Sequence, residues 1–411
     1  PNLTPLVSFP HIESTFKEDL VESPIDTGGN TRAARPMDFK RFLIIDIARF
    51  YAIGLVYYGH YVERIMLLEN PAAAAHYKFV YSFQMVVFIV LAGYVSRESD
   101  LALGFRSYLK YRLVSRLLPF VFFTIIFMIL PIFFSEDLFN LQLPSIDGYR
   151  EGLVNAISGI NLFCVPSWFI LLIFSVEMVH YAFFRFLKSD GKIVVGIIIF
   201  FLAGYWLNTV LDIVNPLKGR VIGWNYLFIH EAITMYSFYL MGSYLRRKNF
   251  FANNLSPRIA LAGTLSCFLV VLLTFNLNAG YFTFPPYDAV VIIFSSYGHF
   301  LWFPVAAISG SLAVLFLAGL TPRWKIVVWM GQNTLILMCL NGIFYHFINP
   351  GVARWLVKSM DVSGSIVFIS GFLMTIVSLA CCIPLVFLLN RYVPQLVGKP
   401  KKRGPLFKSF F

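Results

Sequence analysis

Hydrophobic residues along the chain gather in ten long stretches separated by short polar segments. Each stretch approaches the ~20 residues that a helix needs to cross the hydrocarbon core of a bilayer. The alternation of polar and apolar residues that marks membrane β-strands is absent from the sequence. The pattern therefore predicts an all-α, polytopic membrane helical bundle with about ten transmembrane helices. The predicted spans are 42–62, 79–95, 113–134, 161–184, 193–211, 225–245, 259–277, 298–320, 326–348 and 365–390.

Polar segments flank this hydrophobic block on both sides. Residues 1–38 are rich in Pro, Ser, Thr and acidic side chains and lack the apolar core of a cleavable signal peptide, so we expect a disordered cytoplasmic tail. Residues 39–392 form the membrane domain. Residues 393–411 are a basic cytoplasmic tail, whose GKPKKRGPLFK run suits contact with anionic lipid. The eighth span becomes apolar only near Val290, which indicates a broken or re-entrant entry.

Composition agrees with a membrane protein. The chain is 58% hydrophobic and 13% charged, whereas soluble domains carry about 25% charged residues. Its five cysteines lie in or beside apolar spans without the spacing of metal ligands, so no metal site is expected. The net charge of +12 would suggest a nucleic-acid partner in a soluble protein. Here the distribution of that charge explains it better, and no nucleic-acid partner is predicted.

Lysine and arginine residues fall mainly on one side of the predicted spans. With alternating orientation, 25 of the 33 lie in the two tails and the loops that share their side, 7 lie on the opposite side, and Arg49 lies inside the first span. Cytoplasmic loops carry such an excess. Both termini are therefore expected in the cytoplasm, with Arg49 in the inner half of the membrane and His60 toward the outer half.

The first span carries three ionisable residues, Asp46, Arg49 and His60. Each costs on the order of 2.5–3.5 kcal/mol at the centre of a membrane helix. At ~100° per residue, Arg49 and His60 fall within roughly 20° of each other, about 16 Å apart along the axis. Asp46 lies one turn before Arg49 on the same side. Two interpretations stay open: a stripe that lines a functional cavity, or a buried structural ion pair with an interfacial histidine.

The order Arg49, ten residues, His60 within DIARFYAIGLVYYGH resembles the signature of the acyltransferase type 3 family of integral membrane proteins. The resemblance covers roughly residues 39–392, and ten spans is that family's usual number. Five further stretches are similar to family motifs in order and spacing. They are FQMVVFIVLAGYVSR (83–97), YLKYRLVSRLLPF (108–120), PSWFILLIF (166–174), FYLMGSYLRR (238–247) and MGQNTLILMCLN (330–341).

The resemblance implies an O-acyltransferase of the plasma (inner) membrane that moves an acyl group, with acetyl expected, from cytoplasmic acyl-CoA to a hydroxyl of a cell-envelope glycan. Acetyl-CoA would be a co-substrate and no tightly bound cofactor is expected. His60 would be the base or an acyl carrier, since acyl transfer to a hydroxyl needs a base near neutral pH. Arg49 would polarise the thioester or neutralise a phosphate, with Asp46 fixing its guanidinium.

Arg112 and Arg116, one turn apart at the cytoplasmic start of the third span, are the candidates for binding the donor's phosphates. Membrane anchoring is the alternative. The family often has two arginines three residues apart there, so this spacing of four is a departure. A second departure is Asn341, where many members end the ninth-helix motif in histidine.

Four polar or aromatic residues are candidates for the acceptor side of the cavity. They are Trp168, Glu177, His299 and Asn341. For each, a satisfied interior or interfacial role is the alternative. The chain contains no Gly-x-Ser-x-Gly elbow, P-loop or His-Glu-x-x-His motif. The rival functions are a transporter or flippase that uses the polar stripe as a proton or substrate pathway, and a scaffold or sensor that has lost the chemistry.

Overall fold

The computed structural model describes residues 36–133, 146–210, 226–251, 256–280, 282 and 287–411. These residues are overwhelmingly helical and, in this part of the chain, form no β-strand beyond an isolated bridge between Val291 and Ser296. The α-helices are α2 (Pro36–Met66), α3 (Pro71–Tyr81), α4 (Gln84–Val95), α5 (Glu98–Leu101), α6 (Phe105–Arg112), α7 (Leu118–Phe133), α8 (Ile146–Ser158), α9 (Trp168–Phe183), α10 (Asp190–Val210), α11 (Ile229–Arg247), α12 (Pro257–Thr274), α13 (Trp302–Leu320), α14 (Lys325–Gln332), α15 (Thr334–Ile343), α16 (Asn349–Ser359) and α17 (Gly364–Tyr392).

Short segments of other helical types join these helices. Two are π-helical, and π-helical turns often occur at functional sites. The π-helical segments are Leu113–Leu117 and Phe344–Ile348; the 3₁₀ segments are Val165–Ser167, Phe184–Phe186, Tyr226–Phe228, Ile292–Phe294 and Pro394–Val397. The segment Ile292–Phe294 precedes α13, so the predicted eighth span does enter through non-α structure before its helix begins at Trp302.

Length and apolar composition mark eight helical stretches within the described residues as able to cross a membrane. The stretches are Pro71–Val95, Phe105–Leu130, Val165–Phe186, Asp190–Asn208, Pro257–Thr274, Trp302–Leu320, Thr334–Ser359 and Gly364–Tyr392. The predicted first and sixth spans correspond to α2 and α11, which are not among these eight. The all-α, polytopic class is confirmed, and the count of ten stays a prediction.

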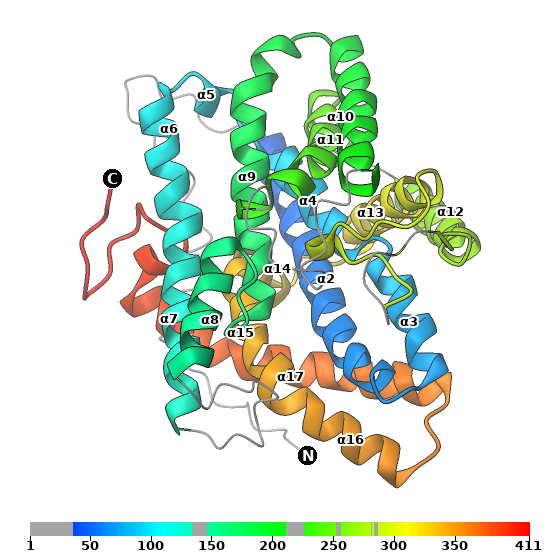
Figure 1. Ribbon diagram of the computed structural model, residues 1–411. Helices are drawn as coiled ribbons and strands as arrows, with labels where there is room; N and C mark the ends of the chain where they lie inside the picture. Colours follow the sequence, from blue (N-terminus) through cyan, green and yellow to red (C-terminus); the bar gives the residue numbers. More distant parts are fainter. Residues whose placement is uncertain (1–35, 134–145, 211–225, 252–255, 281, 283–286) are drawn as a thin grey trace, which may run out of the picture.

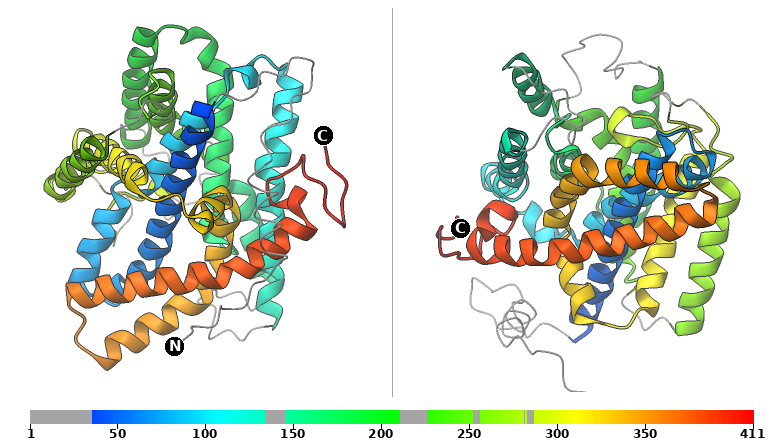
Figure 2. Two further views of the ribbon diagram at one scale, coloured as in Figure 1. Left: turned by 180° about the vertical axis from the view of Figure 1, so that it is seen from behind. Right: turned by 90° about the horizontal axis from the view of Figure 1, so that it is seen from below.

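The helix that carries the polar stripe lies at the centre of the bundle (Figure 1). α2 contacts α3, α4, α13, α14, α15, α16 and α17. Figure 2 shows α17 running across the axes of α2 and α3 rather than along them. Such surroundings shield the ionisable face of α2 from lipid.

Glycines permit the closest helix contacts, as is common at interfaces between membrane helices. A Cβ on Gly93 of α4 would lie 1.9 Å from the carbonyl oxygen of Tyr239 on α11, and one on Gly242 would lie 2.0 Å from that of Val90. Gly331 of α14 meets α2 in the same way, 1.8 Å from the Asp46 carbonyl oxygen. These glycines fall inside the 83–97, 238–247 and 330–341 stretches, so those patterns hold the bundle together.

Candidate active site

His60 lines a cavity of about 240 Å³ enclosed by α2, α3, α4, α9, α15, the π-helical segment Phe344–Ile348 and two segments that contain 3₁₀ turns. One of these segments, Val290–Phe294, is the broken entry to α13. Other lining residues include Glu63, Tyr77, Tyr81, Gln84, Met85, Ile160, Trp168, Tyr287, Met338 and Tyr345. The segment between the predicted seventh and eighth spans therefore contributes directly to the walls around His60, in the part that the structure describes.

The carboxylate of Glu63 lies beside the imidazole, one turn further along α2. Glu63 Oε2 is 3.1 Å from His60 Nδ1, and the Glu63 side chain is 7% exposed. Because an ionised carboxylate is only an acceptor, this contact places the proton of a neutral imidazole on Nδ1. The other ring nitrogen, Nε2, then has a free lone pair and can act as a base.

Three tyrosine hydroxyls complete the surroundings of this carboxylate. Tyr287 and Tyr345 donate to Glu63 Oε1 at 3.1 and 3.2 Å, and Tyr81 donates to Oε2 at 3.3 Å. Burial, with the neighbouring Glu63 carboxylate, raises the pKa of the Tyr287 phenol, so this hydroxyl remains a donor. The His60 ring also meets the Tyr345 ring edge-on, with centroids 4.8 Å apart. Glu63 is thus held by four donors, namely His60 on its own helix and three tyrosines from three other parts of the chain.

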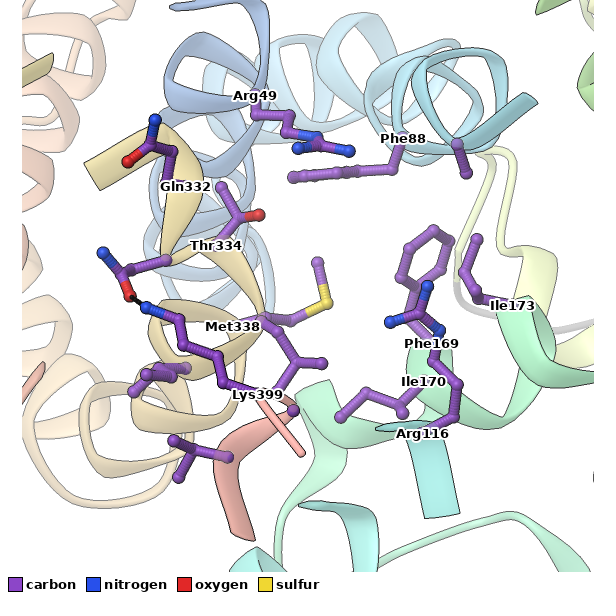
Figure 3. A pocket seen from close by; sticks show the side chains of 16 residues that line it. Arg49, Phe88, Arg116, Phe169, Ile170, Ile173, Gln332, Thr334, Met338 and Lys399 are labelled. Carbon is purple, nitrogen blue, oxygen red and sulfur yellow. Dashed lines mark hydrogen bonds between the residues drawn. The ribbon is translucent and has the colours of Figure 1, made fainter. Parts of the chain in front are cut away.

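Arg49 lines a second cavity of about 220 Å³ on the same side of α2. Figure 3 shows Arg49, Arg116 and Lys399 reaching this cavity from different sides, with Phe88, Phe169 and Met338 among them. Three of the lining residues, Val397–Lys399, come from the C-terminal segment beyond α17. This cavity therefore combines cationic groups with apolar walls.

The predicted pair between Asp46 and Arg49 is present. Arg49 Nη1 lies 3.3 Å from Asp46 Oδ1, and the second carboxylate oxygen accepts from Gln332 Nε2 at 3.0 Å. The guanidinium side chain is still 27% exposed, whereas the Asp46 side chain is 10% exposed. Asp46 thus fixes one edge of the guanidinium and leaves the rest facing the cavity.

The two cavities meet at Met338 of α15, which lines both. On the other walls, residues that are close together in the chain line different cavities. Met85 and Trp168 line the His60 cavity, and Phe88 and Phe169 line the Arg49 cavity. The polar face of α2 is therefore bordered by two adjoining cavities that share the flexible apolar side chain of Met338.

Arg112 and Arg116 both bind Glu177 of α9. Arg116 forms a two-point contact, Nη2 to Oε1 at 2.9 Å and Nε to Oε2 at 3.2 Å, and Arg112 Nη1 lies 3.1 Å from Oε1. Arg112 also contacts Asp100 at 3.3 Å. Of the two arginines, only Arg116 lines the Arg49 cavity. Glu177 was expected on the acceptor side, but it lies in this arginine cluster and does not line the His60 cavity.

The remaining candidates occupy different places. Trp168 lines the His60 cavity, as expected. His299 lines neither cavity, and its Nδ1 accepts from the Leu301 backbone N–H at 3.2 Å. Asn341 is fully buried, and neither polar atom of its amide has a hydrogen-bond partner among the described residues. Asn341 lies one turn from both Met338 and Tyr345, on the face of α15 that is turned toward α2.

Several residues at the site lie outside the candidates drawn from the sequence. Glu63 follows directly after the predicted first span, and its spacing from His60 repeats that of Asp46 and Arg49. This repeated spacing of three is the signal that could have found it. Tyr287 and Tyr345 carry no such local signal, because only the folding of distant segments brings them to Glu63.

Taken together, the fold and the site define a polytopic helical membrane protein with a histidine–carboxylate pair at an internal cavity. A family model described as an acyltransferase domain matches residues 42–389. The chain therefore belongs to the acyltransferase type 3 family and is a membrane acyltransferase. Comparison with curated proteins found no match, and neither did comparison with solved structures.

Proposed function

We propose that the protein is an O-acyltransferase that moves an acetyl group from acetyl-CoA to a hydroxyl of a polysaccharide or other cell-envelope glycan. The observation that carries this proposal is the His60–Glu63 pair at a cavity that adjoins the Arg49 cavity. The Arg49 cavity suits a donor that bears negative charge, and the His60 cavity provides the imidazole as a base. The membrane would be the plasma (inner) membrane, with both termini in the cytoplasm.

In the proposed reaction, His60 Nε2 removes the proton from the acceptor hydroxyl as its oxygen attacks the thioester carbonyl. An ester C–O bond forms and the thioester C–S bond breaks. The imidazolium then returns its proton to the leaving thiolate, so the free thiol of coenzyme A is released. Glu63 acts as a positioning residue, since it orients the ring and stabilises the imidazolium through the 3.1 Å contact.

Arg49 is proposed to contact the donor. Its planar, fixed guanidinium can polarise a carbonyl or bind a phosphate oxygen. Arg116, which lines the same cavity, would contact the donor as well, while Arg112 would act through Glu177 to hold Arg116 in place. The donor would extend past Met338, which lines both cavities. Its thioester would then reach His60 from the Arg49 side.

The acceptor is proposed to enter the His60 cavity between Trp168 and the tyrosines that surround Glu63. Aromatic faces with hydroxyl edges suit a sugar ring, which has apolar faces and a polar rim. Asn341 would supply an amide for the acceptor or the thioester oxygen, because a buried amide that leaves both polar atoms unbonded is costly.

Consumption of the thioester tests this proposal. Purified protein is given acetyl-CoA with and without glycan acceptors, and free thiol is measured for the wild type, His60→Ala and the matched control His76→Gln. His76 lies on α3 and lines neither cavity. Loss of at least ~10²-fold with His60→Ala, and retention with the control, would support the proposal. A transporter would release no thiol, and wild-type rates in a folded His60→Ala protein would refute the role of His60.

A further inference from the structure

The C-terminal segment folds into a compact strap, defined here as residues 394–411. Gly398 reverses the chain with φ +91°, a conformation that favours glycine. Gln395 Nε2 then donates to the carbonyl oxygens of Lys402 and Phe407 at 2.8 and 2.7 Å. The backbone N–H of Phe410 donates to Pro400 at 2.9 Å. The basic tail predicted from the sequence is therefore an ordered part of the fold.

Aromatic and cationic contacts fasten the strap to α6 beside the bundle (Figure 1). The Tyr111 and Phe411 rings meet with centroids 5.6 Å apart. Lys401 Nζ lies 5.6 Å from the Tyr111 ring, and Lys110 Nζ lies 5.4 Å from the Phe411 ring. Such contacts hold the strap against α6.

The strap closes part of the Arg49 cavity and opens a second pocket next to it. This outer pocket has a volume of about 330 Å³. It is lined by Tyr111, Gln332, Gly398, Lys399, Pro400, Lys401 and Lys402. Gln332, Gly398 and Lys399 also line the Arg49 cavity, so the two spaces adjoin. Three of the described lining residues are lysines and none is acidic.

The ammonium group nearest the Arg49 cavity has a fixed position. Lys399 Nζ donates to Asn333 Oδ1 at 2.8 Å, and Asn390 Nδ2 donates to the same oxygen at 2.7 Å. Asn333 is itself held by its Nδ2 donating to the Trp329 carbonyl at 2.8 Å. Lys399 therefore stands at the boundary between the two spaces.

The charge of the lysines contrasts with that of the arginine cluster. Arg112 and Arg116 share Glu177 and Asp100, and Arg49 is paired with Asp46, so the charges within each group balance. Balanced groups attract a polyanion weakly at a distance. The outer pocket, by comparison, has three lysines and no carboxylate among its described lining residues.

We propose that the outer pocket binds the phosphate groups of the donor through Lys399, Lys401 and Lys402, with the acyl arm directed into the Arg49 cavity. This inference rests on the proposed function and deepens it, because it assigns the phosphates to the strap rather than to Arg112. The shared chemistry is a phosphate group, which an anionic lipid headgroup also carries. The experiment therefore separates these two sources.

The test uses the full chain in vesicles of neutral phosphatidylcholine and compares two donors, acetyl-CoA and S-acetyl-pantetheine, which lacks phosphate. The variant is Lys399→Gln with Lys401→Gln and Lys402→Gln. Its matched control is Lys408→Gln, an exposed strap lysine that does not line the pocket. Loss of charge-assisted contacts should raise KM for acetyl-CoA by roughly tenfold or more while kcat is kept. KM for S-acetyl-pantetheine should not change.

Three outcomes would overturn the assignment: an unchanged KM for acetyl-CoA, an equal rise for both donors, or an effect that appears only in vesicles containing anionic phosphatidylglycerol. The last outcome would assign the pocket to lipid headgroups. If the wild type consumes no thioester, the proposed function fails instead. Equilibrium binding of coenzyme A to the wild type and the triple variant then decides the pocket's role separately, since equal affinities would exclude the lysines.

Discussion

Glu63 Oε2 and His60 Nδ1 lie 3.1 Å apart across one turn of the central helix α2. This short-range pairing gives the histidine a defined orientation inside the membrane domain. It also explains why a carboxylate is tolerated there, because His60 and three tyrosines surround it with donors. Function at His60 should therefore depend on a residue that need not touch either substrate.

Glu63→Gln should lower kcat far more than it changes the KM of the donor. The amide keeps the size of the side chain but loses the charge that stabilises the imidazolium, and its NH₂ group would face hydroxyl donors. General-base catalysis contributes about 10²–10⁴-fold, so we expect a fall in kcat of at least ~10²-fold. Steady-state thiol release by purified protein measures it.

Tyr345→Phe is the matched control for this site. It removes one of the four donors to Glu63 while the ring remains against His60. We expect a reduction of less than ~10-fold, the effect of about 1 kcal/mol from a single lost hydrogen bond. If Glu63→Gln were no more harmful than Tyr345→Phe, the charge of Glu63 would not be needed.

Met338→Trp should separate donor binding from acyl transfer. Met338 lines both cavities, so a larger, rigid ring there would block passage between them. We expect coenzyme A binding to be retained and transfer to the acceptor to fall by at least tenfold. The volume-conserving Met338→Leu should leave transfer intact, because such a substitution destabilises the fold by less than ~1.5 kcal/mol. Equal activity of the two variants in a rate assay would show that the acyl group takes another route.

Local patterns in the sequence predict the helices and the polar face of α2 well. The Asp46–Arg49 pair and the common side of Arg49 and His60 follow from the geometry of a single helix. Val290 stands where the chain enters α13 through non-α structure. Such features depend on residues near one another in the chain, which is why the sequence predicts them.

Partners from distant segments could not be predicted in this way. Glu177 lies on α9, and only the packing of α9 against the π-helical segment Leu113–Leu117 turns it toward Arg112 and Arg116 rather than toward His60. Lys399 reaches the Arg49 cavity because Gly398 reverses the chain beyond α17. The MGQN stretch has a clear role only once α14 is seen against α2, where Gln332 binds Asp46.

Gly331→Ala should disturb the site from a distance. The added methyl carbon would lie 1.8 Å from the Asp46 carbonyl oxygen, so α14 must move away from α2. The shift would also move Gln332 away from the Asp46 carboxylate. We expect a lower unfolding temperature and a higher KM for the donor, whereas Gly319→Ala, with nothing within 4 Å, should be neutral or slightly stabilising.

Thermal unfolding of the two glycine variants in detergent, with donor kinetics on the same samples, measures both effects. A Gly331→Ala protein as stable and active as Gly319→Ala would contradict the close approach of α14 to α2. Gly319 is a suitable control because it lies inside α13, where alanine favours the helix by up to about 1 kcal/mol.

Glu177→Met should destabilise the fold, and a second change should repair part of the damage. Removal of this carboxylate leaves Arg112 and Arg116 without their shared partner, and loss of one member of a buried pair costs about 3–5 kcal/mol. Adding Arg116→Met removes one stranded charge, while Arg112 keeps Asp100. The double variant should therefore unfold at a higher temperature than Glu177→Met alone.

The KM of the double variant for the donor should be higher than that of the wild type, because Arg116 no longer lines the Arg49 cavity. Strictly additive losses of stability in this double-mutant cycle would show that the two side chains do not act as a pair.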